Sequence, residues 1–430
     1  MDFLIGLWSV PTADTTFTAA DVNQRITALE SAIKHLSDEV GKETFAPDQK
    51  ICGIFIAPEY FLAHQDAEKV VSSRAIERTI DVGERDACVE LIRNFSTKHK
   101  NVLIVPGTIA WKKTFARNGT DPKTTDRRIR GARHLEYYTN LDARQKLAGM
   151  QARTNAGKGY YRPSAPTRRD MILGNPTSET VGSSTFTTGG NIKYYMRNTA
   201  YAFHDGKVVY KYHKRGDFFE SVNTTETVFI PSFKRPVVSL LVDSTHLMSF
   251  GFEICLDHNI EMLKRVIKDQ NISDPDFHII CSASVSNDTS NMCMRSGGFM
   301  LHASSDNNET GVYKNDKGLK TAVHEYDSVI VGGSLLRLWK IAVATGAGSF
   351  LSDVKGALDA YSRSKTIFAS AASKNALAKL QKLHKDGDLL GLRSHLDWYL
   401  GKPGAKQPTG AGDQIPKDKR FYTLLNAFKY

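Results

Sequence analysis

The stretch 51–59, ICGIFIAPE, is nearly continuous in apolar residues up to a proline, which Glu59 follows directly. A short apolar run of this kind is typical of a strand that is buried on both faces. Residues 3–10 before it and residues 101–107 after it have the same character. Between the first two runs, residues 21–42 repeat apolar side chains at the spacing of one helix face. This alternation of strands and helices predicts an α/β fold.

The alternation resumes after residue 194. Residues 194–204 and 208–212 are two expected strands, and the Asp205-Gly206 dipeptide between them is typical of a hairpin turn. The hairpin is followed by more short apolar runs separated by polar connections. We expect strands at 237–242, 247–255, 277–283 and 321–331, and helices at 67–100 (with a break near Gly83), 260–269 and 292–302.

We expect a main domain at 1–340, an insertion within it at about 111–193, and a helical C-terminal extension at 341–430. The insertion is rich in Arg, Thr, Gly and Asn and has weak periodicity. So long a stretch without regular pattern is typical of an inserted loop or a lid. Residues 352–391 are rich in Ala, Leu and Lys, which favours helices in the extension.

The positive charge of the chain is concentrated in the insertion. The net charge is +11, and the segment from Trp111 to Asp170 alone holds 15 Lys and Arg against five Asp and Glu. The rest of the chain is close to neutral, which argues against a general nucleic-acid-binding surface. The basic segment recruits an acidic or phosphorylated substrate or a partner, or it is a solvated surface excursion or an oligomer contact; the sequence leaves these alternatives open.

Cysteine usage and hydropathy exclude several classes of protein. Five cysteines without a CxxC spacing argue against a disulfide framework and against a structural zinc site. The most apolar long segment, 329–348, contains Arg337 and Lys340, which are too costly for a helix in lipid. The N-terminus has an acid at Asp2 and lacks a basic region, unlike a signal peptide. We therefore expect a cytoplasmic protein without a membrane partner, and secretion without a signal peptide stays open.

Three reactive groups lie at or just beyond the ends of expected strands, where α/β folds gather their sites. Glu59 follows an apolar strand, where partial desolvation raises a carboxyl pKa and suits the group to proton transfer. The hairpin strand delivers Lys211 and Lys214, and a fixed ammonium can stabilise an oxyanion. Side chains along an expected strand at 247–255 point alternately to its two faces, which places Cys255 on the face opposite the large apolar residues. Cys281, in contrast, lies inside an apolar run. Taken singly, a solvated Glu, a surface Lys and an inert buried Cys are the simpler interpretations.

Together and in this order, the three groups resemble the nitrilase (carbon–nitrogen hydrolase) superfamily, whose signature is a Glu, a Lys and a Cys. The segments 58–59, 206–214 and 251–257 are similar to its three motifs, with Tyr-His-Lys closing the second and Gly-Phe-Glu-Ile-Cys-Leu-Asp forming the third. The flanking segments 197–200 and 279–284, and Arg295 after them, resemble the family as well. The resemblance covers about 3–339 without the insertion.

The match has one choice of register and several departures. Counting from Gly206 selects Lys214 rather than Lys211 as the motif lysine. Leu256 stands where the family often has Tyr, and His-Asn-Ile-Glu replaces the expected Arg-Phe-Pro-Glu. Many members use a second Glu after the lysine, for which Glu220 is the nearest candidate and Glu226 another. These departures leave the expected class of reaction unchanged, but the identity of the substrate cannot be taken from the family.

The resemblance implies a four-layer α-β-β-α sandwich and a homodimer or larger assembly, with no metal or organic cofactor. In the implied reaction Glu59 takes the proton of Cys255, whose thiolate attacks an amide, carbamoyl or nitrile carbon. Lys214 and the backbone N–H of Leu256 hold the oxyanion, and water hydrolyses the resulting thioester. The rival interpretations are an acyltransferase that passes the thioester to an amine, and an inactive hydrolase scaffold that binds nucleic acid or acidic partners through the Arg-rich insertion.

Overall fold

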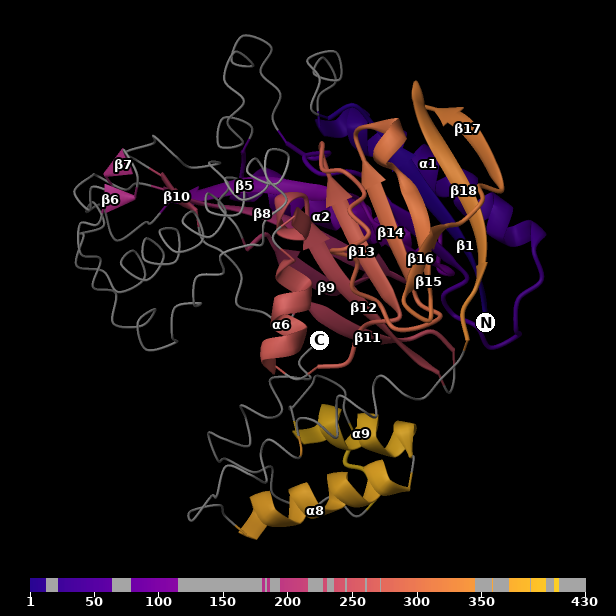
Figure 1. Cartoon of the computed structure of the whole chain (residues 1–430), viewed down its shortest axis with the longest axis vertical. Helices are drawn as coiled ribbons and strands as arrows, with labels where there is room; N and C mark the ends of the chain where they lie inside the picture. Colours follow the sequence, from indigo (N-terminus) through magenta and orange to yellow (C-terminus); the bar gives the residue numbers. More distant parts are fainter. Residues whose placement is uncertain are drawn as a thin grey trace.

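The computed structural model describes most of the expected main domain and two helices of the extension. The described residues are 1–12, 22–63, 79–114, 180–181, 184–185, 194–215, 227–229, 236–243, 246–259, 261–270, 272–344, 358, 371–386, 388–399 and 406–409. They form a mixed α/β fold built on two large sheets (Figure 1), as the alternation in the sequence predicts.

The first sheet has ten strands. Its order is β17-β18-β1-β2-β4-β8-β5-β3, with β9 and β10 also paired to β8. Strands β1, β2 and β4 run parallel at its centre, and every residue of β2 and β4 is buried, as expected from the apolar runs at 51–59 and 101–107. The strands are β1 (Asp2–Ser9), β2 (Gly53–Ile56), β3 (Ile80–Asp81), β4 (Val102–Val105), β5 (Thr108–Thr114), β8 (Tyr194–His204), β9 (Lys207–His213), β10 (Thr227–Phe229), β17 (Asp327–Val331) and β18 (Ser334–Ala342).

The second sheet has six strands in the order β11-β12-β13-β14-β15-β16. Strands β12, β13 and β14 are parallel, and their neighbours are antiparallel. The strands are β11 (Val237–Leu241), β12 (Leu247–Ile254), β13 (Phe277–Ser282), β14 (Phe299–Ser304), β15 (Gly311–Asp316) and β16 (Leu319–Ala322). A separate pair, β6 (Thr180–Val181) and β7 (Ser184–Thr185), is all that the structure describes within 115–193.

The two sheets pack face to face, with helices on their other faces. The ring of Phe3 on β1 meets the ring of Phe277 on β13 edge-on at 5.4 Å, inside a core drawn from both sheets. Helices α1 (Val22–Lys42) and α2 (Val82–Ser96) cover the opposite face of the ten-stranded sheet. Helix α6 (Met262–Gln270), which follows the single turn α5 (Leu256–Asn259), packs through Leu263 against β11. Helix α1 confirms the prediction for 21–42.

The remaining described elements are short or lie after the sheets. A 3₁₀ turn, η3 (Asn307–Glu309), joins β14 to β15. Helices α8 (Ala371–Lys385) and α9 (Leu389–Tyr399) lie against each other and are drawn at the bottom of Figure 1. No helix in the described part of the chain is both long and apolar enough to cross a membrane.

Three sequence-based expectations need revision. The helix expected at 67–100 with a break near Gly83 is confirmed only over α2, because residues 80–81 form strand β3 and Gly83 lies inside the helix; residues 67–78 lie outside the described residues. The helix expected at 292–302 is wrong, because Phe299–Ser304 form strand β14 beside β13. Gly297, just before that strand, has a φ of +78°, a left-handed conformation that does not fit an α-helix. Residues 111–114, expected at the start of the insertion, instead belong to β5 and pair with β8 along the edge of the first sheet.

Candidate active site

Glu59 is held at the end of β2 by backbone contacts to three other segments. Its N–H donates to the carbonyl of Ser282 at 3.2 Å, and its carbonyl accepts from the hydroxyl of Thr12 at 2.6 Å. The next residue, Tyr60, has a φ of +58° and donates its N–H to Oγ1 of Thr108 at 2.9 Å. The side chain of Glu59, which is 0% exposed, therefore projects from a backbone turn that these hydrogen bonds fix.

Lys214 reaches Glu59 from the end of the hairpin. Its N–H donates to the carbonyl of Asn198 at 2.8 Å, which extends the β8–β9 ladder by one residue. Its Nζ lies 2.7 Å from Oε1 of Glu59, and Nδ2 of Asn198 donates to the same oxygen at 2.9 Å. Lys214 is 1% exposed, whereas Lys211 is exposed on β9. The structure therefore brings Lys214 and not Lys211 to the carboxylate.

The second oxygen of Glu59 is in a different situation. Oε1 takes the hydrogen bonds of both Lys214 and Asn198, while the buried Oε2 has no hydrogen-bond partner among the described residues. A buried carboxylate oxygen without a donor is energetically unfavourable. It is also the oxygen that remains able to accept a proton from a neighbouring group.

Cys255 lies directly after β12 in a left-handed backbone conformation, at a φ of +49°. Its N–H donates to the carbonyl of Cys281 at 2.9 Å, and its own carbonyl accepts from the N–H of His258 at 2.9 Å. Non-glycine residues in this region cost free energy and are enriched at active sites. Cys255 keeps 6% of its surface exposed, whereas Cys281 keeps none.

The charges of Glu59 and Lys214 act on the thiol of Cys255. Burial raises the pKa of this thiol well above its usual range, the Glu59 carboxylate raises the pKa further, and the Lys214 ammonium lowers it. The net effect is a thiol that is protonated at neutral pH. Because the thiolate is the nucleophile, a base must remove this proton when the sulfur reacts. The Glu59 carboxylate is the neighbouring group able to do so.

Asp257 links the lysine segment to the turn that carries Cys255. Its carboxylate accepts the hydroxyl of Tyr212 at 2.8 Å and the N–H of Arg215 at 3.0 Å. Burial raises the pKa of Asp257 to about 6, against the N–H of Arg215 and the charge of Lys214, which lower it. Asp257 therefore ties the segment 212–215, which holds Lys214, to the turn that carries Cys255.

The other expected site residues are placed less directly. Leu256 opens α5 next to Cys255 and is half-buried. Glu220 and Glu226, the candidates for a second Glu, lie outside the described residues. Sequence reasoning gave no role to Asn198, although an amide inside a buried strand is a signal that a polar partner lies opposite.

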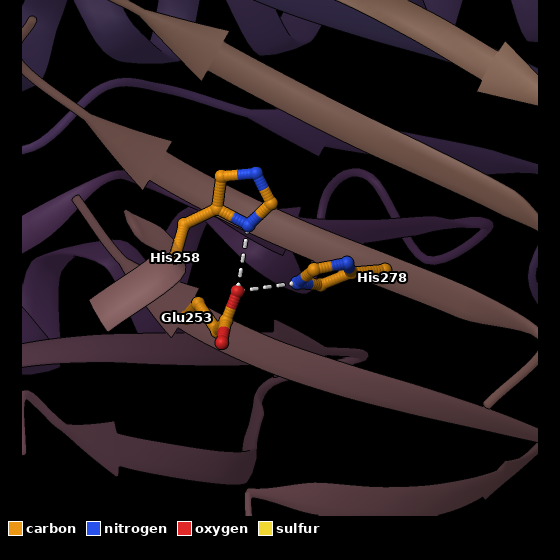
Figure 2. Close-up of side chains that lie close together, drawn as sticks. All are labelled: Glu253, His258 and His278. Carbon is orange, nitrogen blue, oxygen red and sulfur yellow. Dashed lines mark hydrogen bonds and ion pairs between the residues drawn. The ribbon is translucent and has the colours of Figure 1, made fainter. Parts of the chain in front are cut away.

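A second polar cluster includes residues on both sides of Cys255 in the chain. Glu253 on β12, His258 on α5 and His278 on β13 are fully buried, and their side chains converge (Figure 2). One ligand atom from each lies within 4.8 Å of the others, so among the described residues this group has the composition of a metal site. The sequence analysis did not identify it, although a Glu within the apolar run 247–255 was the available signal.

No protein-family model matches the sequence, and no curated protein matches it either. Among solved structures, the fold is similar to a mutant of the Nesterenkonia AN1 amidase from the nitrilase superfamily. That match has 11% identity and a TM-score of 0.35, and covers 79% of this chain and 90% of that one. It is also similar to the glutamine-dependent NAD+ synthetase from Acinetobacter baumannii, with 9% identity, a TM-score of 0.34, and coverage of 93% of this chain and 64% of that one. Neither match reaches a TM-score of 0.5, so the function proposed below rests on the geometry of the site.

Proposed function

We propose that the chain is an enzyme that hydrolyses a non-peptide carbon–nitrogen bond of an amide, a carbamoyl group or a nitrile. The observation that carries the proposal is the buried contact of Glu59 with Lys214, at 2.7 Å, next to the thiol of Cys255. Buried ion pairs are weak contributors to stability, because desolvation offsets much of the attraction. A buried acid, base and thiol assembled from distant parts of the chain are better explained by chemistry.

In the first half of the proposed reaction, Oε2 of Glu59 removes the proton of Cys255 as the sulfur attacks the substrate carbon. The new carbon–sulfur bond pushes negative charge onto the oxygen or nitrogen of the substrate. Lys214 and the backbone N–H of Leu256 stabilise this charge, a contribution of about 3 kcal/mol per donor in comparable sites. The protonated Glu59 then gives its proton to the leaving ammonia or amine when an amide is cleaved. With a nitrile nothing leaves at this step: the Glu59 proton goes to the nitrile nitrogen to give a thioimidate, and a water molecule then adds to it and releases ammonia to leave the same thioester.

In the second half, water hydrolyses the thioester on Cys255. Glu59, again ionised, removes a proton from the water, and the same donors stabilise the second tetrahedral intermediate. The carboxylic acid leaves and the thiol is restored. A thiol with a raised pKa fits this scheme, because it still carries its proton when the substrate binds. Glu59 takes that proton in the first half and passes it to the leaving group.

The wider features of the chain fit the same proposal. Helices α1 and α2 on one sheet and α6 on the other support a four-layer α-β-β-α sandwich. Strand β18 ends at Ala342 and helices follow it, which supports a main domain at 1–340 and a helical extension at 341–430. We further propose a homodimer and an acidic substrate attracted by the basic insertion.

The test is a panel of small amides, carbamoyl compounds and nitriles, neutral and acidic, assayed for ammonia and acid release. Cys255→Ala abolishes release, whereas Cys281→Ala, which removes a buried thiol from the adjacent strand, retains it. Release by Cys255→Ala equal to that of the wild type would refute the proposal. Transfer of the acyl group to added hydroxylamine in place of water would identify an acyltransferase, and salt-dependent nucleic-acid binding without turnover would identify an inactive scaffold.

A further inference from the structure

The carboxylate of Glu253 accepts hydrogen bonds from three segments near the turn that carries Cys255. Its Oε1 accepts the N–H of Leu263 at the start of α6, at 2.6 Å. Its Oε2 accepts Nδ1 of His258 on α5 at 2.9 Å and Nε2 of His278 on β13 at 2.8 Å (Figure 2). Burial alone would raise the pKa of Glu253, but His278 and His258 more than offset this and lower it to about 2. The group is therefore a buried anion whose two oxygens are both hydrogen-bonded.

The protonation of His278 distinguishes a hydrogen-bond network from a metal site. The backbone N–H of Cys293 donates to Nδ1 of His278 at 3.2 Å, so Nδ1 carries a lone pair and the ring proton is on Nε2. If Nε2 of a neutral imidazole bound a metal ion, Nδ1 would carry the proton and oppose the N–H of Cys293. The contact with Cys293 therefore favours Nε2 as a donor to Glu253, not as a metal ligand.

The segment that this network surrounds includes an unfavourable backbone conformation. Cys255, two residues after Glu253, is held at a φ of +49°. A left-handed conformation at a non-glycine residue persists only where the surroundings fix it. His258 meets both ends of this segment, because its N–H donates to the carbonyl of Cys255 and its ring donates to Glu253.

We propose that Glu253 is a positioning residue for Cys255, acting through His258 and the N–H of Leu263, with His278 fixing the orientation of its carboxylate. The role rests on the proposed function, since it presumes that Cys255 is the nucleophile. The network sets the direction of the thiol and of the N–H of Leu256, the proposed oxyanion donor. Its loss lowers kcat with little change in KM, because the residue contacts the turn and not the substrate.

The test compares Glu253→Gln with a matched control, Asp276→Asn. Asp276 is also a buried carboxylate beside this sheet, where it accepts the N–H and hydroxyl of Ser249 and pairs with the guanidinium of Arg295. It lies just before β13, at the opposite end of that strand from the partner of Cys255. The readout is the rate of Cys255 alkylation by iodoacetamide at pH 9 in the full chain, located by peptide mass spectrometry, with the melting temperature measured alongside.

We expect Glu253→Gln to slow alkylation roughly 10- to 100-fold, the size of effect that small misplacements of a reacting group produce. Asp276→Asn keeps the wild-type rate even where it lowers the melting temperature equally. His258→Asn, which retains a donor at the Nδ1 position, reacts faster than His258→Leu, and this pair keeps the test valid if Glu253→Gln does not fold.

Four results would overturn the positioning role. The first two are an unchanged rate in Glu253→Gln and an equal loss of rate in Asp276→Asn. The third is no alkylation of Cys255 in the wild type. The fourth is a stoichiometric divalent metal in the purified protein that Glu253→Gln releases. Alkylation needs no substrate, so a failure of the proposed hydrolysis appears separately, as absence of turnover in a wild type whose alkylation still depends on Glu253.

Discussion

Nζ of Lys214 lies 2.7 Å from Oε1 of Glu59, and neither side chain is more than 2% exposed. The two residues are 155 positions apart in the chain. Removing one partner of such a pair leaves the other charge buried without compensation, which costs about 3–5 kcal/mol. Removing both partners avoids that cost, so stability and activity separate at this pair.

Lys214→Met therefore destabilises the protein by about 3–5 kcal/mol. The double variant Glu59→Gln/Lys214→Met regains most of that loss while remaining inactive. Urea denaturation gives the free energies of unfolding. As a control, Lys34→Met breaks the exposed Lys34–Asp38 pair, which is 2.6 Å long, and costs less than about 1 kcal/mol. A double variant that is no more stable than Lys214→Met would contradict a coupled buried pair.

Glu59→Gln has opposite effects on thiol reactivity and on turnover. The Glu59 carboxylate raises the pKa of Cys255 and Lys214 lowers it, so the neutral Gln leaves only the lowering charge. We expect faster alkylation of Cys255 at pH 7–8, together with a loss of turnover of about 10²- to 10⁴-fold, typical for loss of a general base.

Peptide mass spectrometry of the same digest supplies an internal reference for this experiment. The pKa of Cys52 is raised to about 11 by burial alone, so its alkylation should not change in Glu59→Gln. Slower alkylation of Cys255 in the variant would mean that the carboxylate does not act on the thiol as inferred.

Asp257 makes stability depend on pH in the acid range. Its pKa is raised from 3.8 to about 6, so its protonated form is favoured in the folded state. The stability that the protonated Asp257 contributes is fully present below pH 3.8, the pKa of the group in the unfolded chain, and is lost as the pH rises through about 6, its pKa in the folded protein. We expect the wild type to lose up to about 3 kcal/mol relative to Asp257→Asn between pH 4 and pH 7. Free energies of unfolding that stay parallel over this range would contradict the raised pKa.

Gly107 allows the backbone to approach the turn that carries Glu59. It has a φ of +76°, and a Cβ there would collide with the carbonyl oxygen of Pro58. Gly318 has a φ of +99°, and a Cβ there meets no heavy atom of the described residues within 4 Å. Gly318→Ala thus measures backbone strain alone, about 1 kcal/mol.

Gly107→Ala adds the collision, and we expect a loss of about 3 kcal/mol or more together with lower turnover, because Pro58 and Glu59 must move. Thermal denaturation and the amide assay check the two effects. Equal losses in the two glycine variants would show that the approach to Pro58 is relaxed elsewhere.

Local patterns account for much of the fold. The apolar run at 51–59 becomes β2, and the Asp205-Gly206 turn joins β8 to β9 with φ values of +45° and +71°. These features depend on near neighbours in the chain, so the sequence alone predicts them. Strand β5 was not predicted from the sequence, because Lys112, which is half-buried, and Lys113, which is exposed, break the apolar pattern there.

The site was predictable only in part, for the same physical reason. Glu59, Lys214 and Cys255 were selected by motif resemblance, whereas the contact of Asn198 with Glu59 spans 139 residues and has no local signature. The cluster of Glu253 with His258 and His278 depends on the parallel register of β12 and β13, which pairs Glu253 with Ile280. Pairing between separate strands is set by the packed structure and is not visible in either segment alone.

The most direct test is peptide mapping of the wild type after brief incubation with an amide that it cleaves, with acid quenching to trap the intermediate. We predict an added acyl mass on the peptide that contains Cys255, in the wild type and in Cys281→Ala. The acylated fraction rises when hydrolysis of the thioester is slowed. An acyl group on any other residue, or ammonia release at the wild-type rate from Cys255→Ala, would contradict the assignment of Cys255 as the nucleophile.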